Sequence, residues 1–194
     1  MRVIEAAPDR QLWAQTRHGD PEAFAGLYER HVDAVLNHCF RRTGSWSLAE
    51  DLTSSVFLET WRRRHVLEID TGASMLPWLL GTANNIIRHQ KRSLLRHRRA
   101  LSRLPHGVTG PDPSEEAVAR IDAEARMRRV LGAMKHLTMV EQEVIALCVW
   151  AGLGYADAAV AMGVPVGTVR SRLARARERL RELAPDIPND LGGS

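Results

Sequence analysis

The chain has 194 residues, with 27 Lys and Arg against 23 Asp and Glu, so its net charge is +4 at pH 7. This length allows one or two domains with buried cores, and a hydrophobic content of 44% excludes a chain that is disordered throughout. Only 5% of the residues are aromatic, and alternating runs of β-branched residues are scarce, which argues against an all-β fold.

The cysteines and the uncharged stretches indicate the cellular compartment in which the protein is expected. Cys39 and Cys148 lie far apart and form no CxxC motif, so no disulfide framework is predicted and a reducing compartment is expected. The N-terminus carries charges where a signal peptide has an apolar run. The longest uncharged stretch, residues 71–87, contains Pro77 and is shorter than the roughly 18–20 apolar residues of a membrane span. We therefore expect a cytoplasmic protein with no membrane insertion.

Three helices are predicted in the first half of the chain. Apolar residues at helical spacing predict a helix that ends near Gly44. The capping box Ser47-x-x-Glu50 predicts the start of a second helix, through Arg64. Pro77 is tolerated in the first turn of a third helix, which extends to about Arg99. The apolar positions of the three helices are, in turn, Phe24, Leu27, Tyr28, Val35, Leu36 and Phe40; Leu48, Leu52, Val56 and Trp61; and Leu76, Leu79, Leu80, Ala83 and Ile87.

The third predicted helix also has a polar face, with an aromatic residue at one end and arginines at the other. Its members repeat every three or four residues: Trp78, Thr82, Asn85, His89, Arg92, Arg96 and Arg99. Basic grooves with aromatic or amide groups bind the unstacked bases of single-stranded nucleic acid. The alternative is a solvated basic face with Trp78 in the core.

Charge and composition divide the chain into segments. Residues 88–103 are basic and contain no acidic residue, residues 104–113 are rich in Pro and Gly, and the next stretch is acidic. A helix is expected over residues 114–136, with the apolar anchors Ala117, Ile121, Val130 and Met134. We predict an all-α protein with two small helical domains, residues 20–103 and 114–184. An N-terminal extension (1–19), a flexible linker (104–113) and a disordered tail (185–194) complete it.

The C-terminal part has the pattern of a helix-turn-helix. The capping box Thr138-x-x-Glu141 opens a helix that ends toward Gly152 and Gly154. An Ala-rich helix over residues 155–162 follows, and the turn Gly163-Val164-Pro165 separates it from a longer basic helix. A short helix, a tight turn with Gly and a second helix are typical of DNA-binding domains that read the major groove.

The last helix separates apolar from basic residues. The apolar stripe is Val166, Val169, Leu173, Ala176, Leu180 and Leu183, which leaves Arg170, Ser171, Ala174, Arg175 and Arg177 to face elsewhere. A bidentate contact from Arg to guanine discriminates between bases by roughly 1–3 kcal/mol. The alternative is a solvated amphipathic helix whose arginines pair with its own glutamates. Arg outnumbers Glu six to two between Arg170 and Glu182, so such ion pairs would still leave the helix positively charged.

These stretches resemble a known family. The block VGTVRSRLARARERL is similar to the promoter-reading domain of bacterial RNA polymerase sigma factors of the sigma-70 family. Two further runs are similar to the first conserved domain of the same family: DPEAFAGLYERHVDAVLNHCFRRTGSWSLAEDLTSSVFLETWRRR and MLPWLLGTANNIIRHQKRSLLRHRR. Two such domains with a short linker are the layout of the extracytoplasmic-function (ECF) group. The resemblance implies an alternative sigma factor that binds core RNA polymerase and directs promoter recognition, strand opening and transcription initiation. It implies neither enzymatic activity nor a cofactor.

The resemblance also implies partners and residue roles. The partners are promoter DNA, an anti-sigma factor and core RNA polymerase, through the clamp of its largest subunit and the flap of the second. The residues matching polymerase-binding positions are Asp51, Leu52, Ser55, Phe57 and Trp61, although Ser54 and Ser55 replace the usual Gln and acidic residue. Those matching the single-stranded minus-ten element are Trp78, Asn85, His89, Arg92 and Arg96, with Asn85 lining the pocket of a flipped base. Those matching the minus-thirty-five element are Arg170, Ser171, Ala174, Arg175 and Arg177.

Two other classes of function stay open at this point. A two-domain DNA-binding regulator would explain the C-terminus without binding polymerase, and a sigma-like chain could serve only to sequester an inhibitor. A zinc site at His31, His38 and Cys39 would need a fourth ligand and more suitable spacing. The phosphate-binding motifs GxxxxGK[ST] and GxGxxG do not occur in the sequence.

Overall fold

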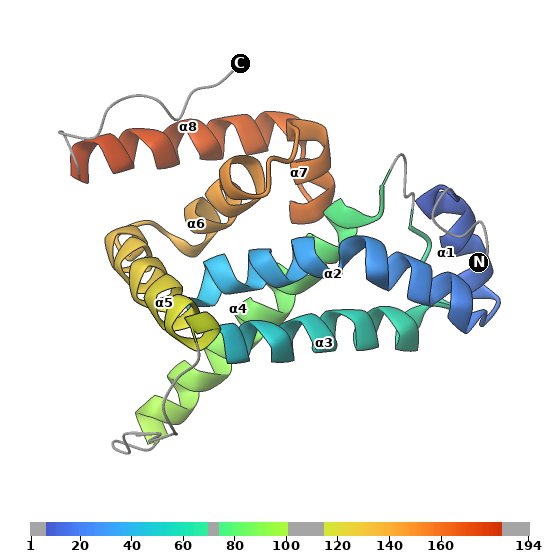
Figure 1. The fold of residues 1–194 in the computed structure, drawn as a ribbon. Helices are drawn as coiled ribbons and strands as arrows, with labels where there is room; N and C mark the ends of the chain where they lie inside the picture. The colour runs from blue at the N-terminus through green and yellow to red at the C-terminus, as the bar shows by residue number, and fades with distance from the viewer. Residues whose placement is uncertain (1–6, 70–73, 101–114, 184–194) are drawn as a thin grey trace.

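The computed structural model describes residues 7–69, 74–100 and 115–183, and only the backbone of residues 91–100, 115–116 and 183. Its described parts are helical and contain no strand, which confirms the all-α prediction (Figure 1). The first domain comprises α1 (Asp9–Arg17), α2 (Pro21–Thr43), α3 (Trp46–Arg63) and α4 (Leu76–Ala100). The second comprises α5 (Glu115–Met134), α6 (Met139–Ile145), the π-helical turn η1 (Ala146–Trp150), α7 (Tyr155–Met162) and α8 (Val166–Leu183). No helix in the described ranges has the length and apolar character needed to cross a membrane.

Both ends of α2 are capped, and its C-terminal end lies at the glycine that the sequence predicted. The Asp20 carboxylate accepts hydrogen bonds from the backbone amides of Glu22 (2.9 Å) and Ala23 (3.3 Å), and Pro21 occupies the first turn. At the other end Gly44 adopts a left-handed φ of 69°, as expected of a helix-terminating glycine. The face between these caps packs on α1, α3 and α4.

The first domain extends further toward the N-terminus than its expected boundary at residue 20. Helix α1 packs on α2 and adds Leu12 and Trp13 to the core, each at most 4% exposed. Residues 9–17 are therefore part of the first domain and not a separate extension.

The start of α3 differs from the prediction. The helix begins at Trp46, one residue before the proposed cap Ser47, and the Ser45 hydroxyl accepts a long hydrogen bond of 3.5 Å from the Leu48 amide. Glu50 does not complete a capping box and instead pairs with Arg120 of α5 at 2.5 Å. An ion pair between the domains has taken the place of the capping-box contact expected of Glu50.

The second domain contains the predicted capping box of Thr138 and Glu141, with both reciprocal hydrogen bonds formed. Two of the four predicted anchors of α5 are wrong, and a third, Ala117, is half-buried. Ile121 is 55% exposed and Val130 is 44% exposed, whereas Met134 is buried as expected. The helix faces the core through Ala123, Met127 and Met134 instead.

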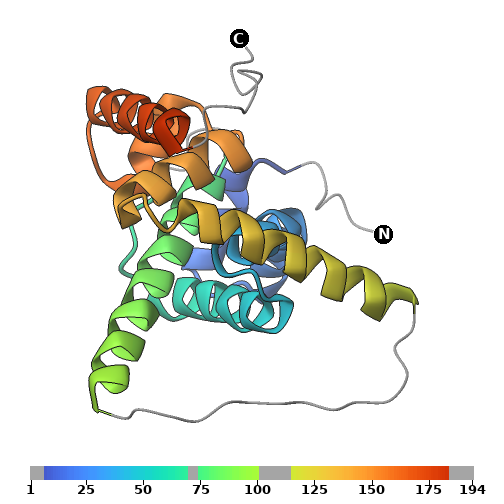
Figure 2. The same ribbon diagram turned by 90° about the vertical axis from the view of Figure 1, so that its left-hand side faces the viewer.

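The two domains pack against each other. Helix α7 lies beside the first half of α4, and α8 covers the opposite side of the second domain (Figures 1 and 2). Gly81 of α4 permits this approach, because a Cβ at that position would clash with the carbonyl oxygen of Ala161. Polar contacts also join the domains: Arg88 pairs with Glu143 at 3.2 Å, and the Trp46 amide donates to a Glu124 carboxylate oxygen at 2.8 Å. The predicted linker and tail lie outside the described residues.

Candidate nucleic-acid and polymerase interfaces

Helices α7 and α8 form the helix-turn-helix that the sequence predicted. Gly163 turns the chain with a left-handed φ of 62°, and the Pro165 carbonyl accepts the first hydrogen bonds of α8, from the amides of Thr168 and Val169. Val169, Leu173 and Ala176 are at most 2% exposed, which confirms the centre of the apolar stripe. Val166, in the first turn, is 36% exposed and does not belong to that buried stripe.

The residues expected to read the major groove lie largely on one exposed face of α8. Arg170, Ser171, Ala174 and Arg175 are all exposed. The Arg175 Nε donates to the Ser171 carbonyl at 3.2 Å, and the Arg170 guanidinium lies 5.6 Å from the centre of the Tyr155 ring. These contacts within the motif hold both arginines against its outer surface.

Arg177 differs from the other predicted base-reading residues. It is half-buried, at the edge of the stripe formed by Leu173 and Ala176. Its charge acts on Cys148 of η1: burial raises the pKa of the Cys148 thiol, and Arg177 partly opposes this rise. The side chain therefore lies toward the interior of the domain and not on the face that carries Arg170 and Arg175.

A second basic surface lies between α8 and the start of α6. Arg172, Arg175 and Arg179 line a cavity of about 380 Å³ beside the capping box. Arg179 pairs with Glu141 at 2.8 Å. Burial works to raise the pKa of Glu141, but hydrogen bonds from Thr138 and the charge of Arg179 lower it overall. The cavity thus adds positive charge beside the exposed face of α8. Positive charge at this place is complementary to the phosphates of a nucleic-acid backbone.

The polar face predicted on α4 is partly observed. Asn85 and His89 are exposed, while Trp78 and Thr82 are half-buried, and Trp78 packs against the hydrophobic core. Arg92, Arg96 and Arg99 belong to the same continuous helix, but their side chains lie outside the described residues. On this face the helix therefore presents the exposed amide of Asn85 between a tryptophan and the basic end.

Two neighbouring asparagines on α4 have opposite environments. Asn84 is 1% exposed, and its Oδ1 accepts a hydrogen bond of 3.0 Å from His38 Nε2, itself buried on α2. Burial lowers the pKa of His38 to about 4, so the ring is neutral near pH 7. Asn85 points outward, one residue further along the helix. Sequence reasoning missed the structural pair of His38 and Asn84, since no local pattern joins two residues so far apart.

The predicted polymerase face on α3 divides into surface and core residues. Asp51 is exposed, Ser55 and Trp61 are half-buried, and the Arg64 guanidinium stacks 3.9 Å from the centre of the Trp61 ring. The other two predicted contact residues, Leu52 and Phe57, are 0% and 4% exposed. Because both lie in the core, they support this face from beneath and offer no surface to a partner.

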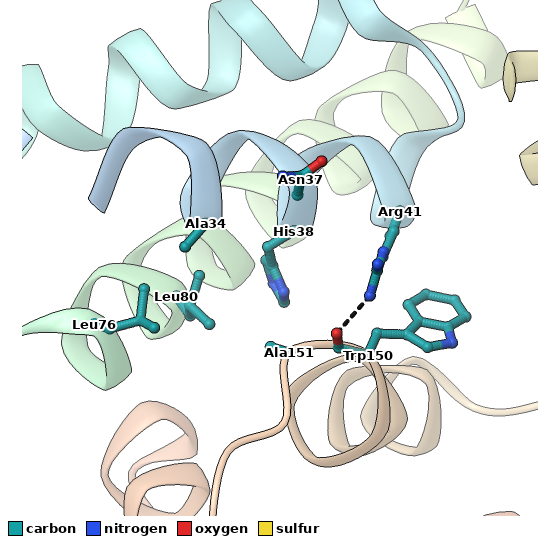
Figure 3. A pocket seen from close by; sticks show the side chains of 8 residues that line it. All are labelled: Ala34, Asn37, His38, Arg41, Leu76, Leu80, Trp150 and Ala151. Atoms are coloured by element: carbon teal, nitrogen blue, oxygen red, sulfur yellow. Dashed lines mark hydrogen bonds between the residues drawn. The ribbon is translucent and has the colours of Figure 1, made fainter. Parts of the chain in front are cut away.

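A cavity of about 280 Å³ lies where the two domains meet. It is bounded by α2, α4 and η1, and Figure 3 shows His38 and Arg41 on one side with Trp150 opposite. Arg41 donates a hydrogen bond to the Trp150 carbonyl across it. Among the described residues no group of three or more His, Cys, Asp and Glu side chains comes together in a way that could hold a metal ion.

Comparisons with known proteins agree with the two-domain arrangement. Residues 27–100 match the family Sigma-70 region 2, and residues 127–180 match Sigma-70, region 4. The chain is 30% identical over 171 residues to RNA polymerase sigma factor CarQ of Myxococcus xanthus, covering 88% of this chain and 94% of the relative. It is 34% identical over 149 residues to ECF RNA polymerase sigma factor SigC of Mycobacterium tuberculosis, covering 75% and 74% of the two chains.

Two solved structures share the fold. CnrH, in complex with the cytosolic domain of CnrY, superposes with a TM-score of 0.67 at 26% identity and covers 93% of this chain and 99% of its own. The sigma factor RpoE of Bartonella quintana, in complex with the anti-sigma factor NepR, has a TM-score of 0.57 at 22% identity and covers 83% and 96%.

Proposed function

The chain belongs to the ECF group of the sigma-70 family, and from its described surfaces we propose how it directs promoter recognition and transcription initiation. Its first domain corresponds to region 2 and its second to region 4. The observation that carries the proposal is that a long helix of each domain exposes a polar face, with Asn85 and His89 on α4 and Arg170, Ser171 and Arg175 on α8. The chain acts with RNA polymerase in the cytoplasm and performs no covalent chemistry.

Each face has a different form of DNA to bind. The face of α8 reads the duplex minus-thirty-five element in the major groove, where arginines find guanine edges. The face of α4 holds a base of the opened minus-ten strand at Asn85, beside Trp78, and offsets the few kcal/mol that unstacking costs. Core RNA polymerase binds the α3 face around Asp51 and Trp61. This division distinguishes an initiation factor from a regulator that binds duplex DNA alone.

The packed arrangement of the domains has a consequence for promoter binding. Elements centred about 25 base pairs apart lie roughly 85 Å apart on straight B-form DNA, at about 3.4 Å per pair. Helix α7 lies beside α4 and packs on α8, so the two reading faces are much closer together than that. The two domains must therefore move apart for both faces to reach their elements at the same time.

Binding to core RNA polymerase tests the first step. We expect the purified chain to co-elute stoichiometrically with core polymerase, and the double variant Asp51→Ala/Trp61→Ala to lose at least tenfold in affinity. Asp33→Ala, an exposed change on α2, serves as the control, and circular dichroism checks that all three chains stay folded. A chain that binds DNA but not polymerase would contradict the proposal and favour the stand-alone regulator.

The Arg175→Ala variant tests the minus-thirty-five face. We expect its holoenzyme to bind promoter DNA about 5- to 150-fold more weakly, since one bidentate base contact is worth roughly 1–3 kcal/mol. Arg181→Ala is the matched control, because Arg181 already pairs with Glu178 at 2.8 Å further along the helix. The affinity is measured by the fluorescence anisotropy of a labelled promoter fragment, and the promoter is identified by mapping transcript 5′ ends. A loss of equal size on every sequence would mean that Arg175 contacts phosphate and not a base.

We also infer that a protein inhibitor of the anti-sigma type is a partner. CnrH, which shares the fold at 26% identity, was solved in complex with the cytosolic domain of another protein, CnrY. Such a partner would need to cover at least one of the faces on α3, α4 and α8 to block initiation.

A further inference from the structure

A buried carboxylate joins three helices of the first domain. Asp9, the first residue of α1, is 3% exposed, and four hydrogen-bond donors converge on it. Its Oδ1 accepts from Arg30 Nη1 at 2.5 Å. Its Oδ2 accepts from His31 Nε2 at 2.7 Å, from the backbone amide of Met75 at 2.6 Å and from the Ser74 hydroxyl at 3.3 Å.

The chemistry of this cluster requires an ionised carboxylate. Only a group with two acceptor oxygens and no proton of its own can accept from four donors, and an amide would turn an N–H toward one of them. Burial alone would raise the pKa of Asp9, but hydrogen bonds from His31, Met75 and Arg30 hold it well below its usual range. His31 must carry its proton on Nε2, because the carboxylate can only accept.

Two of the four donors belong to the segment that starts α4. Met75 and Ser74 immediately precede the helix, and the Met75 carbonyl accepts the hydrogen bond of the Leu79 amide, which closes its first turn. The Ser74 hydroxyl accepts from the Leu76 amide at 3.1 Å while it donates to Asp9. The carboxylate of α1 therefore fixes the position at which α4 begins.

The helix that starts here carries the proposed minus-ten face. Trp78 lies in its first turn, three residues after Met75, and Asn85 lies two turns further on. A helix moves as a rigid rod over this length, so a change at its start displaces both side chains. The hydrogen bonds that read a base tolerate only displacements well below 1 Å. A small shift of either side chain is therefore enough to weaken base recognition.

We propose that Asp9 is a positioning residue for reading of the opened minus-ten strand, acting through Met75 and Ser74 on Trp78 and Asn85. This inference rests on the proposed function of the α4 face. Asp9 does not touch DNA. It sets the register and direction of the helix that does, and the N-terminal helix α1 is thereby part of the promoter-reading apparatus.

The test uses holoenzyme made from core polymerase and the full chain, with Asp9→Asn as the variant. The probe is a promoter-like duplex with a short randomised single-stranded segment, from which bound molecules are sequenced. Leu12→Ala is the matched control, since Leu12 is a buried residue of the same helix with no part in the carboxylate cluster. Both variants are measured well below their melting temperatures, and hydrogen exchange is followed at the amides of Met75, Leu76 and Leu79, which are hydrogen-bonded at the start of α4.

We expect Asp9→Asn to reduce base enrichment in the randomised segment at least fivefold and to speed exchange at the start of α4, while Leu12→Ala keeps the enrichment of the parent. Ser74→Ala should shift both readouts in the same direction, to a smaller extent. Equal enrichment for Asp9→Asn and Leu12→Ala would overturn the inference and reduce Asp9 to a stabilising contact. A parent that enriches no base would instead overturn the function assigned to the α4 face, and the inference with it.

Discussion

Substitution of Gly81 by Ala is expected to drive the two domains apart. The new Cβ would meet the Ala161 carbonyl oxygen well inside van der Waals contact and lie 3.1 Å from its carbonyl carbon. These are backbone atoms of α7, which cannot swing aside as a side chain could, so the whole helix must move. The same change favours α4 itself, because replacing Gly by Ala inside a helix gains about 0.5–1 kcal/mol. The variant should therefore stay folded while its interdomain contact is lost.

Small-angle scattering measures the result directly. A compact chain of 194 residues has a radius of gyration of roughly 16 Å, and Gly81→Ala should exceed the value of the parent. Gly132→Ala is the control, since Gly132 also lies within a helix, α5, but has nothing within 4 Å of its added Cβ. It gains the same helix propensity without a clash. An unchanged radius for Gly81→Ala would show that α7 does not pack on α4 in solution.

The features predicted correctly from the sequence are those encoded locally. The stripe of Val169, Leu173 and Ala176 lies on one helix, so its period alone identifies the buried side. The Thr138 capping box and the Gly44 terminus are equally local, and both are observed. The exposed position of Asn85 follows from the same helical arithmetic, because the neighbouring residues of α4 have to fill the core.

The features missed depend on contacts between distant segments. Glu50 looked like part of a capping box, but Arg120 lies within reach of it only after the domains have packed. Leu52 and Phe57 were expected at the polymerase surface through resemblance, and their apolar character was the signal that they belong to the core. The cluster around Asp9 joins residues 9, 31 and 75, which no periodic pattern relates. Its only sign in the sequence is an acidic residue in the first turn of a short helix.

Substitution of Asn84 by Ala should destabilise the protein without altering how it reads DNA. His38 would lose its acceptor inside the core, and a buried donor without a partner costs about 1–3 kcal/mol. Denaturant unfolding should detect this loss. Holoenzyme assembled at low temperature should still open promoters with the base preference of the parent. A change in that preference would mean that Asn84, and not its neighbour alone, reaches the DNA.

Substitution of Asn85 by Ala should have the opposite effect. The residue is exposed, and Ala is the better helix former, so the free energy of unfolding should stay equal or rise slightly. An amide that binds a base edge is worth roughly 1–3 kcal/mol, so strand opening should fall about 5- to 150-fold, measured as permanganate reactivity of unpaired thymines in the minus-ten element. Asn84→Ala and Asn85→Ala make the same chemical change at adjacent positions. Comparing the two variants therefore separates an effect on stability from an effect on base reading. If Asn85→Ala opened promoters as well as the parent, the minus-ten assignment of this face would be wrong.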